Sequence, residues 1–177
     1  MNNILRLSFL VLLLTFHLSD ISAQEKTGKP TSAIAADISA IRAQFQKTNS
    51  VPLKMEKFNY EAEGCVEDGI VTYFTNGKSI VKIIESGSIG DGSWINEYYY
   101  QSGKVIFCYE VIVGGPAIGN VTRTERRYYV KNDRIIQYIE DKKIMKPEPG
   151  ATVIIRIANE ILKAYTTKDF ASALCNP

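Results

Sequence analysis

The stretch WINEYYYQSGKVIFCYEV, residues 94–111, places runs of bulky residues on both sides of a Ser-Gly pair. Aromatic and β-branched residues favour strands, and a Ser-Gly pair accepts the positive φ angles of a two-residue hairpin turn. The stretch therefore predicts a β-hairpin with its turn at residues 102–103. In strict alternation from that turn Tyr98 opposes Phe107, and one face of the hairpin is almost wholly apolar.

The same pattern recurs before and after this hairpin. Three segments each contain a tyrosine, a two-residue turn, a basic residue and an isoleucine in that order: residues 73–80, 99–106 and 129–136. This pattern is similar to the hairpin units of MORN-like repeat proteins of bacteria, and the resemblance implies successive hairpins without implying a function. Together with a further strand over residues 53–62, the segments predict an antiparallel meander.

Two amphipathic helices are expected to flank this sheet. Apolar residues recur at helical spacing near the start of the domain (Ile34, Ile38, Ile41, Phe45) and near its end (Ile154, Ile157, Ala158, Ile161, Leu162, Tyr165). The predicted fold class is α+β, with a curved antiparallel meander of about six to eight strands and both helices packed on one face. The alternative is a half-open β-barrel around a ligand cavity.

The N-terminus has the features of a secretory signal peptide. Arg6 precedes the mostly apolar run 7–16, which is shorter than a bilayer span, and Ala23 is a small residue at the expected cleavage point. We therefore expect a secreted or periplasmic protein with no transmembrane span after signal removal. The expected organisation is a signal peptide over 1–23, a flexible segment over 24–30 and a single α+β domain over 31–177.

Composition argues against several classes of function. The only histidine, His17, lies within the predicted signal peptide, so the mature chain lacks the commonest general base and metal ligand. No spacing typical of a metal or cofactor site is present, and we expect neither. A net charge of +2 is too small to indicate a nucleic-acid partner.

The three cysteines of an exported chain favour one disulfide and one free thiol. Cys108 lies in a predicted strand, where a buried thiol is ordinary. The sequence therefore favours a bridge between Cys65 and Cys175, while the other pairings and the absence of a bridge stay open.

Two glutamates are the candidate catalytic residues. In the predicted register Glu97 and Glu110 share one face and lie diagonally across the hairpin, roughly 7–8 Å apart. Such a separation suits a pair of carboxylates in a glycoside hydrolase. The competing interpretation is a solvated sheet face.

Five further side chains are candidate ligand-binding residues. Trp94, Tyr98 and Tyr100 would stack on sugar rings if their face were open, and they would form core if it were covered. Arg123 and Arg127 would share a face and hold an anion or acidic glycan. Cross-strand charge pairing is the competing interpretation for these arginines.

These observations favour a non-catalytic, exported protein of the bacterial envelope or periplasm. We expect it to bind a small molecule, a glycan or an envelope protein on its sheet. The alternatives are a histidine-free hydrolase that uses the carboxylate pair, and a structural or assembly module that pairs through a sheet edge.

Overall fold

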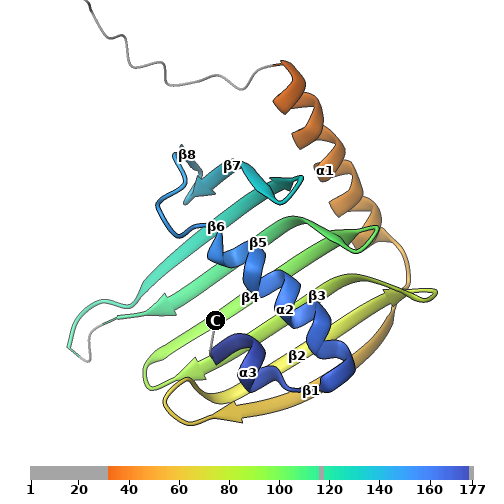
Figure 1. The fold of residues 1–177 in the computed structure, drawn as a ribbon. Coiled ribbons are helices and arrows are strands. Elements are labelled where there is room, and N and C mark those ends of the chain that lie inside the picture. Colours follow the sequence, from red (N-terminus) through yellow and green to blue (C-terminus); the bar gives the residue numbers. More distant parts are fainter. Residues whose placement is uncertain (1–31, 116–117, 176–177) are drawn as a thin grey trace, which may run out of the picture.

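The computed structural model describes residues 32–115 and 118–175. The elements in chain order are α1 (Ser32–Ser50), β1 (Lys54–Ala62), β2 (Val66–Asn76), β3 (Ser79–Ile89), β4 (Gly92–Gln101), β5 (Lys104–Gly114), β6 (Thr122–Lys131), β7 (Arg134–Glu140), β8 (Lys143–Met145), α2 (Val153–Thr167) and α3 (Phe170–Cys175). Each strand pairs antiparallel with the next, so the sheet follows the order of the chain (Figure 1). The predicted α+β meander is confirmed, as an open sheet rather than a barrel. The predicted signal peptide and the flexible segment 24–30 lie outside the described residues.

The three hairpins that share the sequence repeat also share a β-bulge. The strand pairing skips Val81 in β3, Ile106 in β5 and Ile136 in β7. Each of these apolar residues is the third after its two-residue turn. An extra residue of this kind bends the strand and increases its right-handed twist. In the first hairpin the turn is Gly77-Lys78 and the bulge is Val81, each one residue later than the turn and the isoleucine of the sequence pattern. The isoleucine of the pattern is thus the bulge residue only in the second and third hairpins.

The bulge overturns the register predicted for the central hairpin. Tyr98 pairs with Cys108 and not with Phe107, because Ile106 is the extra residue of β5. One inserted residue moves every later side chain of β5 to the other face of the sheet. Tyr98 therefore shares a face with Cys108, while Tyr99 shares the opposite face with Phe107.

Helix α2 lies diagonally across one face of the sheet (Figure 1). Beneath it, Tyr73 and Tyr100 are almost fully buried, and their hydroxyls donate hydrogen bonds to the main-chain oxygens of Ile161 and Ala158, each at 2.6 Å. A carbonyl oxygen has two lone pairs, so it can accept a tyrosine hydroxyl in addition to its helical partner. The two bonds fix the position of α2 along its axis as well as its distance from the sheet.

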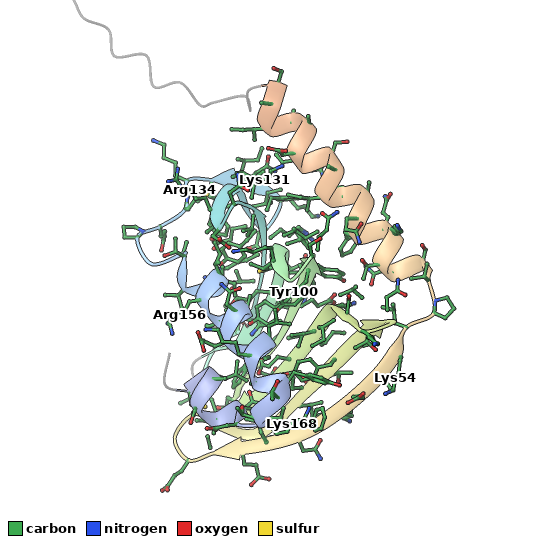
Figure 2. All side chains as sticks on the ribbon, turned by 45° about the vertical axis from the view of Figure 1, so that its right-hand side comes forward. Lys54, Tyr100, Lys131, Arg134, Arg156 and Lys168 are labelled. Atoms are coloured by element: carbon green, nitrogen blue, oxygen red, sulfur yellow. A yellow bond between two sulfur atoms is a disulfide. The ribbon has the colours of Figure 1, made fainter. Side chains whose placement is uncertain are left out.

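Helix α1 packs on the opposite face, which corrects the expectation of two helices on one face. Ile38 and Ile41 of α1 form a core cluster with Tyr99, Phe107 and Tyr129, separate from the core beneath α2. Figure 2 shows the sheet between α1 and the α2–α3 pair. The expectation failed because the second face was taken to be solvated, whereas the bulge at Ile106 places Phe107 on it, beside Tyr99 and Tyr129.

Helix α3 is held to the edge of the sheet by a ring and by a disulfide. Phe170 is 3% exposed and lies against Phe58 of β1, with ring centroids 5.7 Å apart. The disulfide joins Cys65, in the β1–β2 turn, to Cys175 at the end of α3, which is the pair favoured from the sequence. Cys108 is a buried free thiol. The C-terminal segment is thus closed onto β1 and β2.

Three buried tyrosines provide a matched test of how α2 is held. We expect Tyr73→Phe and Tyr100→Phe each to lower the free energy of unfolding by about 1 kcal/mol, because each removes one buried hydrogen bond. Tyr98→Phe should be neutral or stabilising, because the Tyr98 hydroxyl is buried without a hydrogen-bond partner among the described residues. Urea unfolding of the three variants measures these changes. Equal losses in all three would contradict a specific role for the two bonds to α2.

Candidate functional site

Five polar side chains form a continuous row across strands β3 to β7. Glu85, Asn96, Glu110, Arg126 and Glu140 are successive cross-strand partners. The row lies on the α2 face, beside the aromatic row that contains Tyr98, and we call it the polar row. Its members belong to five different strands, so the row exists only when the four pairings from β3 to β7 have this register.

The β3 end of the polar row is closed to solvent. Glu85 is 2% exposed, and its Oε1 accepts hydrogen bonds from Tyr60 Oη and Trp94 Nε1, both at 2.7 Å. Its Oε2 accepts a hydrogen bond from Asn96 Nδ2 at 2.8 Å. Burial raises the pKa of Glu85, and the three hydrogen bonds only partly oppose this effect. All three donors are neutral, so this carboxyl has no direct ion-pair partner among them.

Two glycines allow the donor rings to lie over Glu85. Tyr60 is paired with Gly69, and Trp94 is paired with Gly87. A Cβ atom at either glycine would lie 2.4 Å from a carbon of the paired ring, which is closer than packed atoms approach. Each ring therefore covers a glycine on the neighbouring strand, and its polar atom reaches Glu85.

Arg126 joins the two glutamates at the open end of the polar row. Its Nη1 lies 3.1 Å from Glu110 Oε2, and its Nε lies 2.9 Å from Glu140 Oε2. Tyr138 also donates a hydrogen bond to Glu140. The hydrogen bonds from Tyr138 and Arg126 lower the pKa of Glu140, so this carboxylate is ionised at neutral pH. The three charges hold one another in place before any ligand binds.

A cleft opens over this end of the polar row. It has a volume of about 440 Å³ and lies between the sheet and the beginning of α2. The sheet contributes the charged groups and the paired tyrosines, and residues 148–151 with the first turns of α2 form the other wall. Its charged lining residues are Glu110, Arg126, Glu140 and Glu148. Acids outnumber bases by three to one, so the cleft favours a ligand that carries hydrogen-bond donors or positive charge.

Glu97 and Glu110 do not form the predicted carboxylate pair. Glu110 faces α2 with Arg126, whereas Glu97 lies on the α1 face, where Lys82 Nζ is 2.9 Å from its Oε2. The bulge at Ile106 separates them, because it shifts β5 by one residue relative to β4. A sheet lies between the two carboxylates, so they cannot act on one glycosidic bond.

Two of the aromatic candidates belong to the core, and the third, Trp94, is half-buried over Gly87. Tyr98 and Tyr100 are at most 1% exposed, and Trp94 donates its indole hydrogen bond to Glu85. None of the three is free to stack on a sugar ring. Trp94 and Tyr98 flank Asn96 of the polar row along β4, and Tyr100 lies one step further along the same face.

The structure places both arginine candidates close together, but their guanidinium groups are already engaged in ion pairs. Arg123 and Arg127 share the α1 face and both pair with Glu125. The Arg127 guanidinium also lies 5.2 Å from the ring centroid of Tyr109. Charge pairing within strand β6 thus accounts for both arginines, and it replaces the cross-strand pairing of the competing interpretation.

Of the predicted site residues, only Glu110 lies in the cleft. Arg126, Glu140 and the buried Glu85 were not singled out from the sequence. A bulge at Ile106 would have placed Glu110 opposite Asn96, and a bulge at Ile136 would have placed Arg126 opposite Glu140. The sequence signal for these bulges was a pair of adjacent apolar residues after the turn: Ile80-Val81, Val105-Ile106 and Ile135-Ile136.

Comparison with known proteins gives no relative from which a function could be transferred. No family model matches the chain, and no curated protein or solved structure shows significant similarity to it. Residues 32–115 and 118–175 contain no group of three or more acidic, cysteine or histidine side chains placed to hold a metal ion. Within those ranges, no helix combines the length and apolar character needed to cross a bilayer. The function therefore has to be argued from the cleft itself.

The buried Glu85 predicts a specific dependence of stability on pH. A glutamate has a pKa of about 4.3 in the unfolded chain, and its folded pKa is raised, so the folded state holds the proton more tightly. Its contribution to stability is fully present below about pH 4.3 and is lost as the pH rises through the folded pKa. Glu85→Gln cannot ionise, so we expect its free energy of unfolding to rise relative to wild type with increasing pH.

Urea unfolding of wild type and Glu85→Gln at several pH values from about 4 to 8 measures this difference. Glu61→Gln is the matched control, because Glu61 is exposed on β1. Its curve should run parallel to that of wild type. A Glu85→Gln curve that also runs parallel would show that Glu85 titrates as it does in the unfolded chain.

Proposed function

We propose that this protein is exported and acts as a non-catalytic binding protein of the bacterial envelope or periplasm. Its ligand site is the cleft between the beginning of α2 and strands β5 to β7. The observation that carries the proposal is the arrangement of Glu110, Arg126 and Glu140 at the floor of that cleft. These groups are positioned by one another and by the sheet, so little ordering is needed on binding.

The residues that line the cleft favour a small ligand with several hydrogen-bond donors and one apolar surface. Tyr128 and Tyr138 are stacked with centroids 4.9 Å apart, and Ile154 and Ile157 of α2 form part of the opposite wall. Carboxylate oxygens accept hydrogen bonds, and the excess of acids attracts an amine. An amino sugar combines these properties, and it belongs to the small molecules and glycans expected as partners.

The groups that would perform catalysis are poorly suited to it. Burial raises the pKa of the Cys108 thiol far above its usual range, so the thiol stays protonated and unreactive. The lowered pKa of Glu140 makes it a weak general acid. Glu85 has the raised pKa of an acid but is sealed beneath Tyr60 and Trp94. A hydrolase that uses Glu97 and Glu110 is not supported by their placement on opposite faces.

Two observations support export. The sequence of residues 1–23 has the pattern of a signal peptide, and a disulfide joins Cys65 to Cys175. Structural disulfides persist mainly in oxidising compartments such as the periplasm. A chain that relies on this bridge to fasten α3 would fold best after export.

The binding proposal is tested with a pair of sugars that differ in one charge. Glucosamine carries an ammonium group, and N-acetylglucosamine carries an uncharged amide in its place. We expect glucosamine to raise the thermal midpoint and N-acetylglucosamine to have little effect, as measured by scanning fluorimetry. Glu110→Gln should weaken glucosamine binding about tenfold by calorimetry, because it removes a charge-assisted hydrogen bond.

Glu97→Gln is the control for that experiment, since it removes the same charge from the opposite face. Its affinity for glucosamine should equal that of wild type. The proposal would be contradicted by the absence of binding, or by equal losses in Glu97→Gln and Glu110→Gln.

Export is tested by expressing the full chain with its own N-terminus in a Gram-negative host. The mature protein should be recovered from the periplasm with Gln24 as its first residue, as read by mass spectrometry. It should carry no free thiol at Cys65 or Cys175 after labelling under denaturing conditions. A cytoplasmic product that retains Met1 would contradict this part of the proposal.

A further inference from the structure

At the C-terminal end of α2, away from the cleft, an ammonium group lies among three aromatic rings. Lys168 Nζ is 3.8 Å from the ring centroid of Tyr165, 4.0 Å from that of Phe58 and 5.6 Å from that of Tyr73. We call these three rings the aromatic box. Each ring attracts a cation placed over its face, and the attraction increases when several rings share one cation.

A carboxylate completes this environment. Glu56 Oε2 accepts a hydrogen bond from the Tyr165 hydroxyl at 3.1 Å, and Glu56 Oε1 lies 2.9 Å from Lys54 Nζ. The hydrogen bonds from Lys54 and Tyr165 lower the pKa of Glu56, and the charge of Lys168 adds to this effect. The negative charge of Glu56 therefore lies close to the aromatic box and favours a cation within it.

The aromatic box adjoins a second pocket, which has a volume of about 450 Å³. Tyr165 and Glu56 line this pocket together with Leu162 and the β2–β3 turn. Tyr165 is the ring of the aromatic box that faces this pocket, and Lys54 and Lys78 also line it. A molecule in the pocket can therefore place one end against the Tyr165 ring.

Lys168 occupies the aromatic box from an unfavourable backbone position. It is the C-terminal cap of α2 with a φ of 60°, in the left-handed region where glycine is the usual residue. Lys168 is exposed, so its side chain can move into water. Figure 2 shows Lys168 at the corner between α2 and α3, beside the lower strands of the sheet. The lysine is therefore a tethered cation at the mouth of the box rather than a buried part of the core.

We propose that the aromatic box is a second binding site, specific for a trimethylammonium group, and that Lys168 is its displaceable internal occupant. A lysine ammonium is strongly hydrated, whereas a quaternary ammonium has no N–H groups to hydrate. The quaternary ammonium therefore loses less hydration free energy when it moves from water to the aromatic rings. Aromatic cages of this kind bind choline-like and methylated ammonium groups in proteins.

Because Lys168 competes for the aromatic box, it weakens the binding of an external cation there without abolishing it. The apparent affinity for a ligand falls by the fraction of molecules in which the box is empty. Emptying the box permanently should therefore tighten binding of an external cation. Lys168→Gly does this while relieving the left-handed backbone, and Lys168→Asn does so with a residue that also tolerates this conformation.

The experiment titrates choline chloride into wild type, Lys168→Gly, Lys168→Asn and Lys168→Met, followed by calorimetry and by NMR shifts of the Tyr165 ring. Choline should bind the Gly and Asn variants about tenfold more tightly than wild type. The Met variant keeps an apolar side chain that can remain against the rings, so its affinity should not exceed that of wild type. Dimethylbutanol, the uncharged carbon isostere of choline, should bind none of the four proteins measurably.

A further variant, Lys168→Gly with Tyr165→Leu, should lose choline binding because one wall of the box is gone. The proposal is overturned if the Gly and Asn variants are folded and bind choline no better than wild type, or if dimethylbutanol binds as well as choline. Glu110→Gln should leave choline binding unchanged. A failure at the aromatic box is thereby distinguished from a failure at the cleft, which is tested with glucosamine.

Discussion

Three β-bulges, each at the third residue after a tight turn, determine which side chains of the sheet meet which helix. At Val81, Ile106 and Ile136 one extra residue shifts the strand by a single position relative to its partner. In β5 this shift places Cys108 and Glu110 on the α2 face and Phe107 on the α1 face. Phe107 thereby joins the rings that α1 covers, while Cys108 joins the core beneath α2. The bulges at Ile106 and Ile136 also set two pairings of the polar row, Asn96 with Glu110 and Arg126 with Glu140.

The charged groups of the polar row lie among aromatic rings, partly or wholly removed from bulk water. The free-energy cost of removing them from water is offset in a different way at each end of the row. At the closed end Glu85 is surrounded by neutral donors and tends to keep its proton. At the open end Arg126 pairs with two carboxylates that still reach the cleft. Helix α2 covers the region between the cleft and the aromatic box, and the tyrosine bonds to Ala158 and Ile161 hold it there. The same helix thus forms part of both proposed sites.

Local features of this fold were predictable from the sequence, and features that depend on register were not. Turn residues and apolar periodicity identified the hairpins, both main helices and the meander, because these signals act over a few residues. The favoured disulfide followed from excluding Cys108 as a strand residue. The bulge was missed, and with it the true partners of Glu97 and Glu110. The aromatic box joins Phe58 and Tyr73 to Lys168, so it arises only when distant segments meet.

The bulge in β5 places Phe107 with Tyr99 beneath α1, and Cys108 with Tyr98 beneath α2. Nuclear Overhauser contacts from the ring protons of Phe107 test this placement. We expect contacts from Phe107 to Phe45 of α1, whose ring centroid is 5.4 Å away, and to Tyr99, whose ring centroid is 5.8 Å away. Contacts from Phe107 to α2, or to Tyr98 as its direct cross-strand partner, would contradict this register.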